Sequence, residues 1–368
     1  MIKKVNSIIS ASWIFTADKN NTLLEDHSIV ILEDEILDIL PTKNVFDGYE
    51  ANEVFALSEH IIMPGFINNH THAAMSLLKG FANDVPLKSW LEDYIWPAEK
   101  EYVSEAFVKD GSLIAIAEMI KSGTTTFNDM YFYPNQTAEA AVEMGIRANI
   151  GLVVMEFPTN YASDPDDYLK KGLDFRDQWR GDGLISTSLA PHAPYTTSDK
   201  TLNTIGTYAD QLNMTIHTHL HETKEEVENS INQYKATPIQ RYKSLGLLGP
   251  NLMAAHCTHV DESDLNLLHQ NNVNVVHNPS SNLILGSGIA DISKMLDLGI
   301  NVSIGTDSSA SNNRLDVLEE VRLAALLGKG LNHQPEILDS KNVFKMATYN
   351  AAKAMNKSKM IGSIEPNK

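Results

Sequence analysis

Apolar and polar positions along this chain follow two patterns, and the change falls near residue 60. Residues 1–60 contain short apolar runs, such as VNSIISASWIFT and SIVILEDEILDIL, that are separated by turn residues. Runs of this kind predict a small β domain over residues 1–60. After residue 60, short apolar runs alternate with longer amphipathic segments, which is the pattern of strands that alternate with helices.

Eight strand-like runs follow residue 60. They lie at residues 61–67, 124–130, 147–157, 183–195, 214–222, 251–259, 272–282 and 300–312. Among the helical segments between them, residues 104–123 have Ser104 as a candidate N-cap and Gly123 as a stop signal. Eight alternating units predict a closed, parallel (β/α)8 barrel over residues 61–355. An open, doubly wound sheet is the alternative, but the Gly-rich phosphate loop expected after its first strand is absent from the sequence.

Composition narrows the class of protein. The chain has 47 Asp and Glu against 29 Lys and Arg, a formal net charge of −18, which argues against nucleic-acid or anionic membrane partners. The single cysteine, Cys257, excludes a disulfide framework and indicates a reducing compartment. The N-terminus lacks a signal-peptide core, and no apolar run reaches the roughly 18–20 residues of a membrane span. We therefore expect a cytoplasmic protein.

The first barrel strand ends in a pair of histidines, His70 and His72. Side chains at positions i and i+2 of a strand point to the same face, so this pair aims two imidazoles at one point. Such a pair can form half of a metal site, although an isolated HxH is more often a solvated or structural pair.

Histidines recur at the ends of the later strands. Seven of the 13 histidines lie at or just beyond predicted strand ends: His70, His72, His192, His219, His221, His256 and His277. Ordinary strand ends are rich in Gly, Asn, Asp and Ser rather than His. Because catalytic residues of a barrel lie at the carboxyl ends of its strands, the pattern predicts a metal-centred active site there.

Two carboxylates accompany these histidines. Asp307 follows the last strand, where it is either a turn residue or the ligand that compensates the charge of a metal held by imidazoles. Glu222 follows a strand in which His219 and His221 alternate with His217, and it is a candidate general acid, although a lone Glu at such a place is usually solvated. His217, the earliest of the three, is expected to be a packed core histidine.

The chain resembles a known family. The resemblance runs over essentially the whole sequence, in PGFINNHTHAAMSLLKG, SWLEDYIWPAEK, SGTTTFNDMYF, PHAPYT, HTHLHET, AAHCTH, HNPSSNLILGSGIA and GTDSSASNN. The sequence resembles the amidohydrolase superfamily and, within it, the 5′-methylthioadenosine/S-adenosylhomocysteine deaminases, which are close to the triazine hydrolases. This resemblance implies a homo-oligomeric, metal-dependent deaminase that converts 5′-methylthioadenosine to the inosine derivative and ammonia. Adenosine and S-adenosylhomocysteine are the further candidate substrates.

The resemblance also implies a role for each candidate residue. One divalent metal, normally zinc in such deaminases, would be held by His70, His72, His219 and Asp307. The catalytic residues would be Glu222 as proton donor to the ring, His256 as the group that orients the attacking hydroxide, and Asp307 as base. Substrate contacts would come from Glu99 to the ribose hydroxyls, from His192 and Glu222, and from Trp90, unless Trp90 is only a half-buried loop aromatic. Two-metal relatives use a carboxylated Lys after the fourth strand, and residues 183–195 contain no Lys, which favours one metal.

Two departures from the family pattern affect these expectations. Family members that accept S-adenosylhomocysteine hold its carboxylate with Arg after the third strand. This chain has acids there, Glu156, Asp164, Asp166 and Asp167, and its nearest Arg176 and Arg180 are expected in a helix, so an uncharged thioether nucleoside is the better candidate substrate. The ending GSIEPNK resembles the turn from which relatives return to their small domain. We therefore expect residues 356–368 to begin that return and the C-terminal half of the domain to be missing.

Two other functions remain open at this point. One is the hydrolysis of another aminated or chlorinated heterocycle, of the triazine, guanine or cytosine type. The other is a non-catalytic scaffold built on the same fold, against which the intact set of candidate ligands argues.

Overall fold

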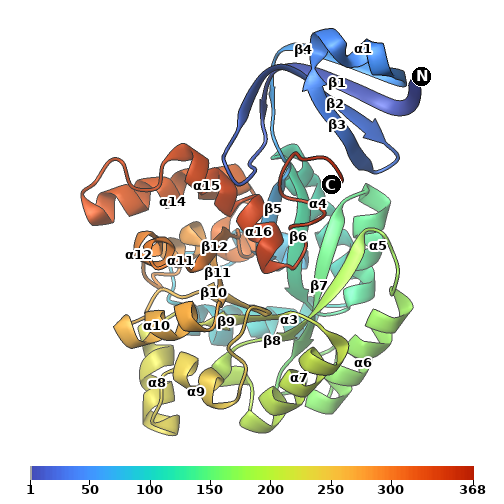
Figure 1. Ribbon diagram of the computed structural model, residues 1–368. Coiled ribbons are helices and arrows are strands. Elements are labelled where there is room, and N and C mark those ends of the chain that lie inside the picture. The colour runs from blue at the N-terminus through green and yellow to red at the C-terminus, as the bar shows by residue number, and fades with distance from the viewer. Residues whose placement is uncertain (1) are drawn as a thin grey trace.

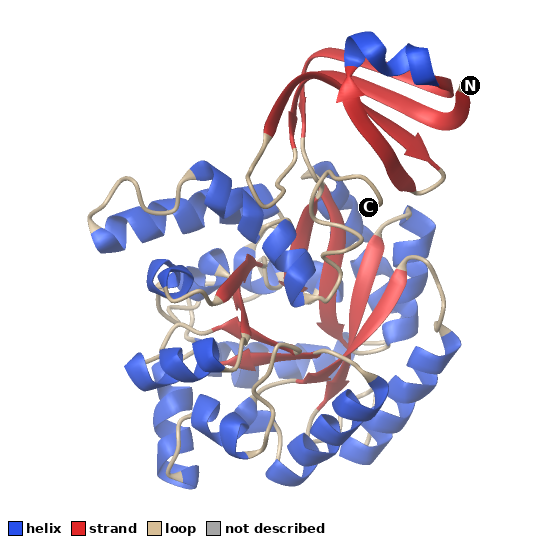
Figure 2. Ribbon diagram, viewed as in Figure 1, coloured by secondary structure: helices blue, strands red, loops and turns tan. Residues whose placement is uncertain are grey.

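The computed structural model describes residues 2–368. Its strands form two separate sheets, one of four strands and one of eight (Figure 1). Helices surround the larger sheet, whereas the smaller sheet stands at one end of the molecule beside the N-terminus (Figure 2). The C-terminus lies at the junction between the two sheets.

The four-stranded sheet is built from the N-terminal part of the chain. Its strands are β1 (Lys3–Phe15), β2 (Leu23–Leu32), β3 (Glu35–Pro41) and β4 (Tyr49–Ile62), in the order β3-β2-β1-β4. The short helices η1 (Thr42–Asn44) and α1 (Val45–Gly48) connect β3 to β4, and Ile8 and Val30 pack against Val45. The end of the chain returns to this sheet, where the backbone of Ile36 in β3 forms hydrogen bonds of 2.7 Å with Asn367 and Lys368.

The eight-stranded sheet is a nearly closed parallel barrel. Its strands are β5 (Phe66–Thr71), β6 (Thr124–Tyr131), β7 (Arg147–Val154), β8 (Ile185–Pro191), β9 (Ile216–Leu220), β10 (Leu252–His256), β11 (Asn274–His277) and β12 (Asn301–Ile304). Each strand pairs with the next one in sequence. The first and last strands meet just beyond β12, where the backbone N–H of Asp307 donates to the carbonyl of His70. The predicted (β/α)8 barrel with a small N-terminal β domain is confirmed.

The helices lie between and around the barrel strands. They are η2 (Ala73–Leu78), α2 (Leu87–Ser89), η3 (Trp90–Ile95, a π-helix), α3 (Trp96–Tyr102), α4 (Glu105–Lys121), α5 (Pro134–Met144), α6 (Pro165–Gln178), η4 (Pro194–Thr196), α7 (Asp199–Leu212), α8 (Lys224–Tyr234), α9 (Pro238–Ser244), α10 (Glu262–Gln270), α11 (Pro279–Ile284), α12 (Ile292–Asp297), α13 (Ser309–Asn312), α14 (Val317–Asn332), α15 (Ser340–Met346) and α16 (Tyr349–Ala354). Helix α4 begins as predicted, because the Ser104 hydroxyl accepts the Phe107 N–H, and Gly123 follows its end at φ +90°. No helix of residues 2–368 combines the length and apolar character needed to cross a membrane.

The predicted first strand of the barrel is wrong in its position. Ile61 and Ile62 end β4 of the small sheet, and β5 begins only at Phe66, after a break at Pro64 and Gly65. Proline removes a backbone donor, and a Cβ on Gly65 would lie 2.3 Å from the side chain of Thr125, so this break is built into the packing. The shift places His70 inside β5 and His72 just beyond it.

The two ends of the barrel differ in character. At one end, Ile67, Met253 and Ala255 point inward and pack against Ala351 and Ala352 of α16, which closes the barrel with apolar side chains. The carboxyl ends of the strands lie at the other end, where histidine, aspartate and glutamate side chains gather. The architecture therefore leaves a single polar end for a site among the described strands.

Candidate metal centre and active site

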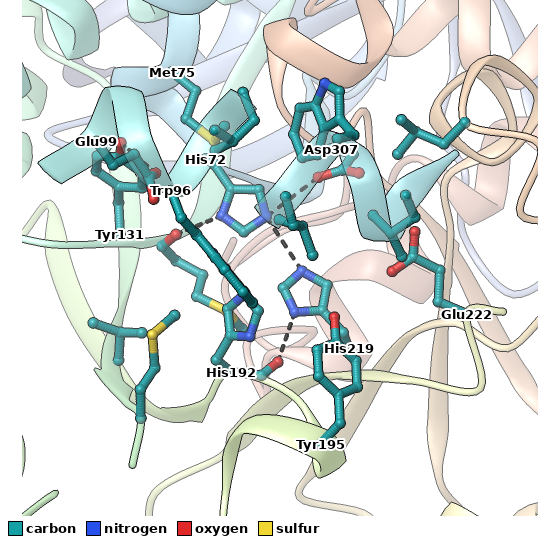
Figure 3. Close-up of a pocket in the computed structure, with 18 of the residues that line it drawn as sticks. His72, Met75, Trp96, Glu99, Tyr131, His192, Tyr195, His219, Glu222 and Asp307 are labelled. Atoms are coloured by element: carbon teal, nitrogen blue, oxygen red, sulfur yellow. Dashed lines mark hydrogen bonds and ion pairs between the residues drawn. The ribbon is translucent and has the colours of Figure 1, made fainter. Parts of the chain in front are cut away.

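The four predicted ligands come together at the polar end of the barrel. One possible ligand atom from each of His70, His72, His219 and Asp307 lies within 4.8 Å of all the others. Asp307 Oδ1 is 3.2 Å from His72 Nε2 (Figure 3). The same oxygen is 3.4 Å from His70 Nε2. The barrel closure positions this set, because His70 lies in β5, His72 follows it directly and Asp307 follows the adjacent β12.

The hydrogen bonds of the imidazoles leave the Nε2 atoms of His72 and His219 free to bind a metal. His72 Nδ1 donates to the carbonyl of Met130 and His219 Nδ1 to the carbonyl of His192, both at 2.6 Å. A carbonyl can only accept, so the protons lie on Nδ1 and the Nε2 atoms carry lone pairs. The two Nε2 atoms face one another at 3.2 Å, and the buried Nε2 of His70 has no hydrogen-bond partner among residues 2–368. Facing lone pairs require a cation between them, and three imidazoles with one carboxylate fit a divalent metal.

The electrostatics of His70, His219 and Asp307 favour the same conclusion. Burial lowers the pKa of His70 to about 4 and that of His219 well below its usual range, which keeps both rings in the neutral, ligating form. Burial opposes charge on His72 as well, but its contact with Asp307 raises the pKa of that imidazole to about 9, so Asp307 stabilises positive charge at this point. Burial opposes charge on Asp307 too, but its contacts with His70 and His72 hold the pKa of the carboxyl well below its usual value. Asp307 is thus an anion that compensates a cation, and Ser281 donates to its Oδ2 at 2.5 Å.

A buried carboxyl group and an imidazole lie beside the four ligands. Glu222 is 4% exposed, and this burial raises the pKa of its carboxyl group above the usual range. Its Oε2 is 3.7 Å from Nε2 of His256, whose Nδ1 donates to Asn282 Oδ1 at 2.7 Å. The backbone at His256 has φ +76° and at Asp307 φ +61°, a left-handed geometry that costs a non-glycine residue about 1 kcal/mol or more. Such strained positions concentrate at functional sites.

The opposite wall of the site carries a second buried carboxyl group. Glu99 of α3 accepts a hydrogen bond from the Tyr131 hydroxyl at 2.8 Å, and burial raises the pKa of Glu99 to about 7. His192 follows β8, and its ring centroid lies 4.7 Å from that of His219. Trp90 is 5% exposed rather than half-buried.

One cavity joins these groups. Of the residues proposed from the sequence, its wall includes His72, Trp90, Glu99, His192, His219, Glu222, His256 and Asp307. His70 lies behind them and is fully buried. The cavity therefore combines a site for a divalent metal, a carboxyl group that keeps its proton to unusually high pH, and a wall for an organic substrate.

Residues 61–368 match the amidohydrolase family. The chain belongs to this family. It is 45% identical to a 5-methylthioadenosine/S-adenosylhomocysteine deaminase of Saccharophagus degradans, over 98% of this chain and 81% of that protein. It is 41% identical to a 5′-deoxyadenosine deaminase of Methanosarcina acetivorans, over 95% of this chain and 79% of that protein.

Solved structures agree with the family assignment. The crystal structure of an adenosine deaminase from Xanthomonas campestris with bound zinc has a TM-score of 0.98 and 38% identity, and covers 100% of this chain and 84% of that chain. A zinc complex of atrazine chlorohydrolase from Arthrobacter aurescens has a TM-score of 0.90 over 98% of this chain and 85% of that one, but at 23% identity it shares the fold alone.

Not every strand-end histidine of this amidohydrolase belongs to the site. The expectation that His221 shares a strand face with His219 is wrong, because β9 ends at Leu220 and His221 has φ +55°. His221 instead donates from Nδ1 to the carbonyl of His259. His277 is buried, and neither ring nitrogen has a partner among residues 2–368. His217 is packed in the core as expected, with Nε2 2.8 Å from His70 Nδ1.

The acids after the third barrel strand do not lie where they were expected to act. Glu156 accepts hydrogen bonds from the Ser198 N–H and the Thr201 hydroxyl, Asp164 caps α6, and Asp167 pairs with Lys171. The cavity next to the active site has a volume of about 380 Å³ and is lined instead by apolar side chains, among them Trp96, Met155 and Phe157, together with the polar Glu99, Lys100, Thr159 and Asn160. The prediction that this acidic cluster faces a substrate tail is therefore wrong, and Arg176 lies in α6 as expected.

Several wall residues of this amidohydrolase were missed in the sequence. Trp96 stands across the centre of the cavity (Figure 3). It packs edge-on against Phe157, with ring centroids 5.4 Å apart. Tyr131 and Tyr195 also line the wall. Tyr131 ends β6 and could have been found by the strand-end rule, whereas Trp96 comes from a helix, for which the strand pattern carries no signal.

Proposed function

We propose that this amidohydrolase is a metal-dependent deaminase of adenosine derivatives, which releases ammonia and leaves the inosine derivative. The observation that carries the proposal is the presence, in one cavity, of the four-ligand site and of Glu222, whose burial raises the pKa of its carboxyl group. The names of the relatives from Saccharophagus degradans and Methanosarcina acetivorans support the adenosine class. Zinc is the proposed metal, because it favours three or four nitrogen and carboxylate ligands and is bound in the structure from Xanthomonas campestris.

The chemistry divides among the residues around the site. When bound, a divalent cation supplies a hydroxide nucleophile at neutral pH, because it lowers the pKa of a coordinated water to about 7. Glu222 would donate its proton to a ring nitrogen and so make the neighbouring, amino-bearing carbon electrophilic. Asp307 would accept the proton of the nucleophile, and His256 would orient it from the side next to Glu222. The raised pKa of Glu222 suits a group that must begin the reaction protonated.

The far wall suits a nucleoside rather than a free base. Glu99 lines the active-site cavity and also the adjoining cavity of about 380 Å³. Above about pH 7, where Glu99 is ionised, its carboxylate at this boundary is placed to accept hydrogen bonds from two neighbouring ribose hydroxyls, and His192 and Trp90 line the same cavity. The substituent on the 5′ carbon would then enter the adjoining cavity.

The adjoining cavity favours an uncharged 5′ substituent. Trp96, Phe132, Met155 and Phe157 form its apolar wall, and Lys100 is the only basic side chain on it. A methylthio group or a 5′-deoxy methyl group gains free energy on burial there, whereas a zwitterionic amino-acid tail must be desolvated. We therefore propose 5′-methylthioadenosine and 5′-deoxyadenosine as preferred substrates.

A substrate panel tests the proposal. Ammonia release is measured from adenosine, 5′-methylthioadenosine, 5′-deoxyadenosine and S-adenosylhomocysteine, with guanine and an amino-triazine as alternative heterocycles. Turnover of the nucleosides but not of guanine or the triazine supports the proposal. Turnover of the triazine or guanine alone identifies a different hydrolase, and a metal-free protein without activity on any of them identifies a scaffold.

Two further expectations concern the state of the protein in the cell. A reducing, cytoplasmic location is supported by Cys257, the only cysteine, which is buried and unpaired. Self-association is supported by large apolar side chains that are about half exposed on the small sheet, namely Trp13, Val54, Phe55 and Ile61.

A further inference from the structure

Glu222 is held in two independent ways, through its backbone and through its side chain. Its backbone N–H donates to Glu226 Oε2 at 2.8 Å, and its carbonyl accepts from the Thr258 hydroxyl at 2.5 Å. The side chain has one hydrogen bond within residues 2–368: the Ser287 hydroxyl donates to Glu222 Oε1 at 3.2 Å. The backbone contacts cannot fix the rotation of the carboxyl group, so its orientation depends on Ser287.

Ser287 is itself held by a residue that the metal site does not use. His259 Nε2 donates to the Ser287 carbonyl at 2.6 Å. His259 is fixed in turn, since its carbonyl accepts from His221 Nδ1 at 2.7 Å. The next residue of the loop, Gly288, has φ +131°, and a Cβ there would lie 3.0 Å from His259 Nε2. The loop therefore packs closely on the imidazole, and the hydroxyl of Ser287, 3% exposed, has a defined place.

The direction of the hydrogen bond matters for a proton donor. A carboxyl group that must give up a proton has to carry it on the oxygen that faces the acceptor. The hydroxyl of Ser287 donates to Oε1, which leaves Oε2, on the side of His256, as the oxygen free to carry the proton of the neutral acid. Without this contact the terminal torsion of a glutamate is broad, and the two oxygens can exchange places.

We propose that Ser287 is a positioning residue that fixes which oxygen of Glu222 carries the proton, and that His259 holds Ser287 in place for this purpose. This inference rests on the proposed function, because it concerns the group assigned as proton donor to the ring. It gives a role to His221 and His259, which follow β9 and β10 and do not belong to the proposed set of metal ligands.

Four variants test the proposal in the metal-loaded enzyme. Ser287→Ala removes the hydroxyl, Ser287→Cys keeps the size but leaves only a weak donor, and Ser287→Thr keeps the hydroxyl. Ser293→Ala is the matched control, since Ser293 is another buried serine of the same region whose hydroxyl has no partner among residues 2–368. We expect kcat with adenosine to fall roughly 10-fold in Ser287→Ala and Ser287→Cys, with KM within about 3-fold and metal content unchanged. Ser287→Thr and Ser293→Ala should stay close to the parent enzyme.

A double-mutant cycle separates positioning from general support of the fold. Ser287→Ala is combined with Glu222→Gln, and kcat is measured for both single variants and the pair. If Ser287 acts through the carboxyl group, its removal should lower kcat less than about 2-fold in the Glu222→Gln background. Losses that multiply, or equal losses in Ser287→Thr and Ser287→Ala, would overturn the inference.

The same cycle distinguishes this inference from the proposed function. If Glu222→Gln loses turnover and both Ser287→Ala and Ser287→Cys retain it, the positioning role is wrong and the assignment of Glu222 stands. If Glu222→Gln itself retains turnover with metal bound, both are wrong. If Ser287→Ala does not fold, Ser287→Cys decides the question by the same criteria.

Discussion

The backbone N–H of Asp307 donates to the carbonyl of His70 at 2.9 Å, and the carboxylate of Asp307 lies 3.4 Å from His70 Nε2. The last proposed ligand in the sequence is thus fixed directly to the first, across the seam where the barrel closes. Because one contact joins both strand ends, the geometry of the site depends on the closure of the whole barrel.

This arrangement predicts one tightly bound divalent ion per chain. His219→Ala removes a nitrogen ligand and should abolish stoichiometric metal binding and lower turnover by ~10³-fold or more. Elemental analysis of the purified protein and of a chelated sample measures the metal. His60→Ala, which removes an exposed histidine from the small sheet, is the control and should keep both metal and activity. Two ions per chain, both needed for turnover, would contradict the assignment.

Glu222→Gln should separate metal binding from proton donation. The amide keeps the size of the side chain but cannot protonate the ring, so we expect kcat to fall by ~10²–10⁴-fold while the metal stays bound. Steady-state ammonia release and elemental analysis of the same preparation give the two values. Near-normal turnover of this variant would show that another group is the proton donor.

Glu99→Ala should discriminate between nucleosides and free bases. Loss of a charged hydrogen bond to the ribose is expected to weaken kcat/KM by ~1–3 kcal/mol for nucleosides and much less for the corresponding bases. Glu101→Ala, on the same helix but exposed, is the matched control. Equal losses with both classes of substrate would remove Glu99 from the ribose site.

Glu99 should also make folding stability depend on pH. Burial raises the pKa of its carboxyl group to about 7, whereas an unfolded glutamate has a pKa of about 4.3–4.5. The folded state therefore binds a proton that the unfolded state has lost, and the stabilising contribution, present below about pH 4.5, is lost as pH rises toward 7. In urea unfolding, the free energy of unfolding of the metal-loaded enzyme should fall more steeply over this pH range than that of the Glu99→Gln variant. Parallel pH profiles would mean that Glu99 is ionised in the fold.

The adjoining cavity predicts the order of substrates. We expect 5′-methylthioadenosine to have a kcat/KM about 10-fold higher than S-adenosylhomocysteine, which corresponds to about 1.4 kcal/mol, because the apolar wall cannot solvate a charged tail. Lys100→Ala should leave 5′-methylthioadenosine unaffected and widen the difference. If S-adenosylhomocysteine had the higher kcat/KM, and Lys100→Ala restored the preference for 5′-methylthioadenosine, Lys100 would be identified as the residue that binds the tail carboxylate.

The sequence by itself determined the barrel and the ligand set. Strand and helix periods alternate over residues 61–355, and His70, His72, His219 and Asp307 all lie at or next to strand ends. These features are local. The spacing of apolar residues shows which face of each segment is apolar, and parallel strands place their carboxyl ends at the same end of the barrel. For this reason the candidate ligands could be placed at one end of the barrel, whereas the choice of these four as a single metal site followed from the resemblance to the amidohydrolase deaminases.

Only the tertiary structure decided which of the neighbouring side chains belong to the active site. His219 and His221 look equivalent in the sequence, but the backbone of His221 turns to φ +55° once β9 has ended. Its ring donates a hydrogen bond to His259, which in turn holds the carbonyl of Ser287. The approach of Trp96 to the site and the turn of Glu156 toward Ser198 likewise depend on how helices and loops pack over the barrel. Such contacts join residues from different helices, strands and loops. The hydrophobic periodicity of one segment cannot predict the distance between a residue in it and a residue in another segment.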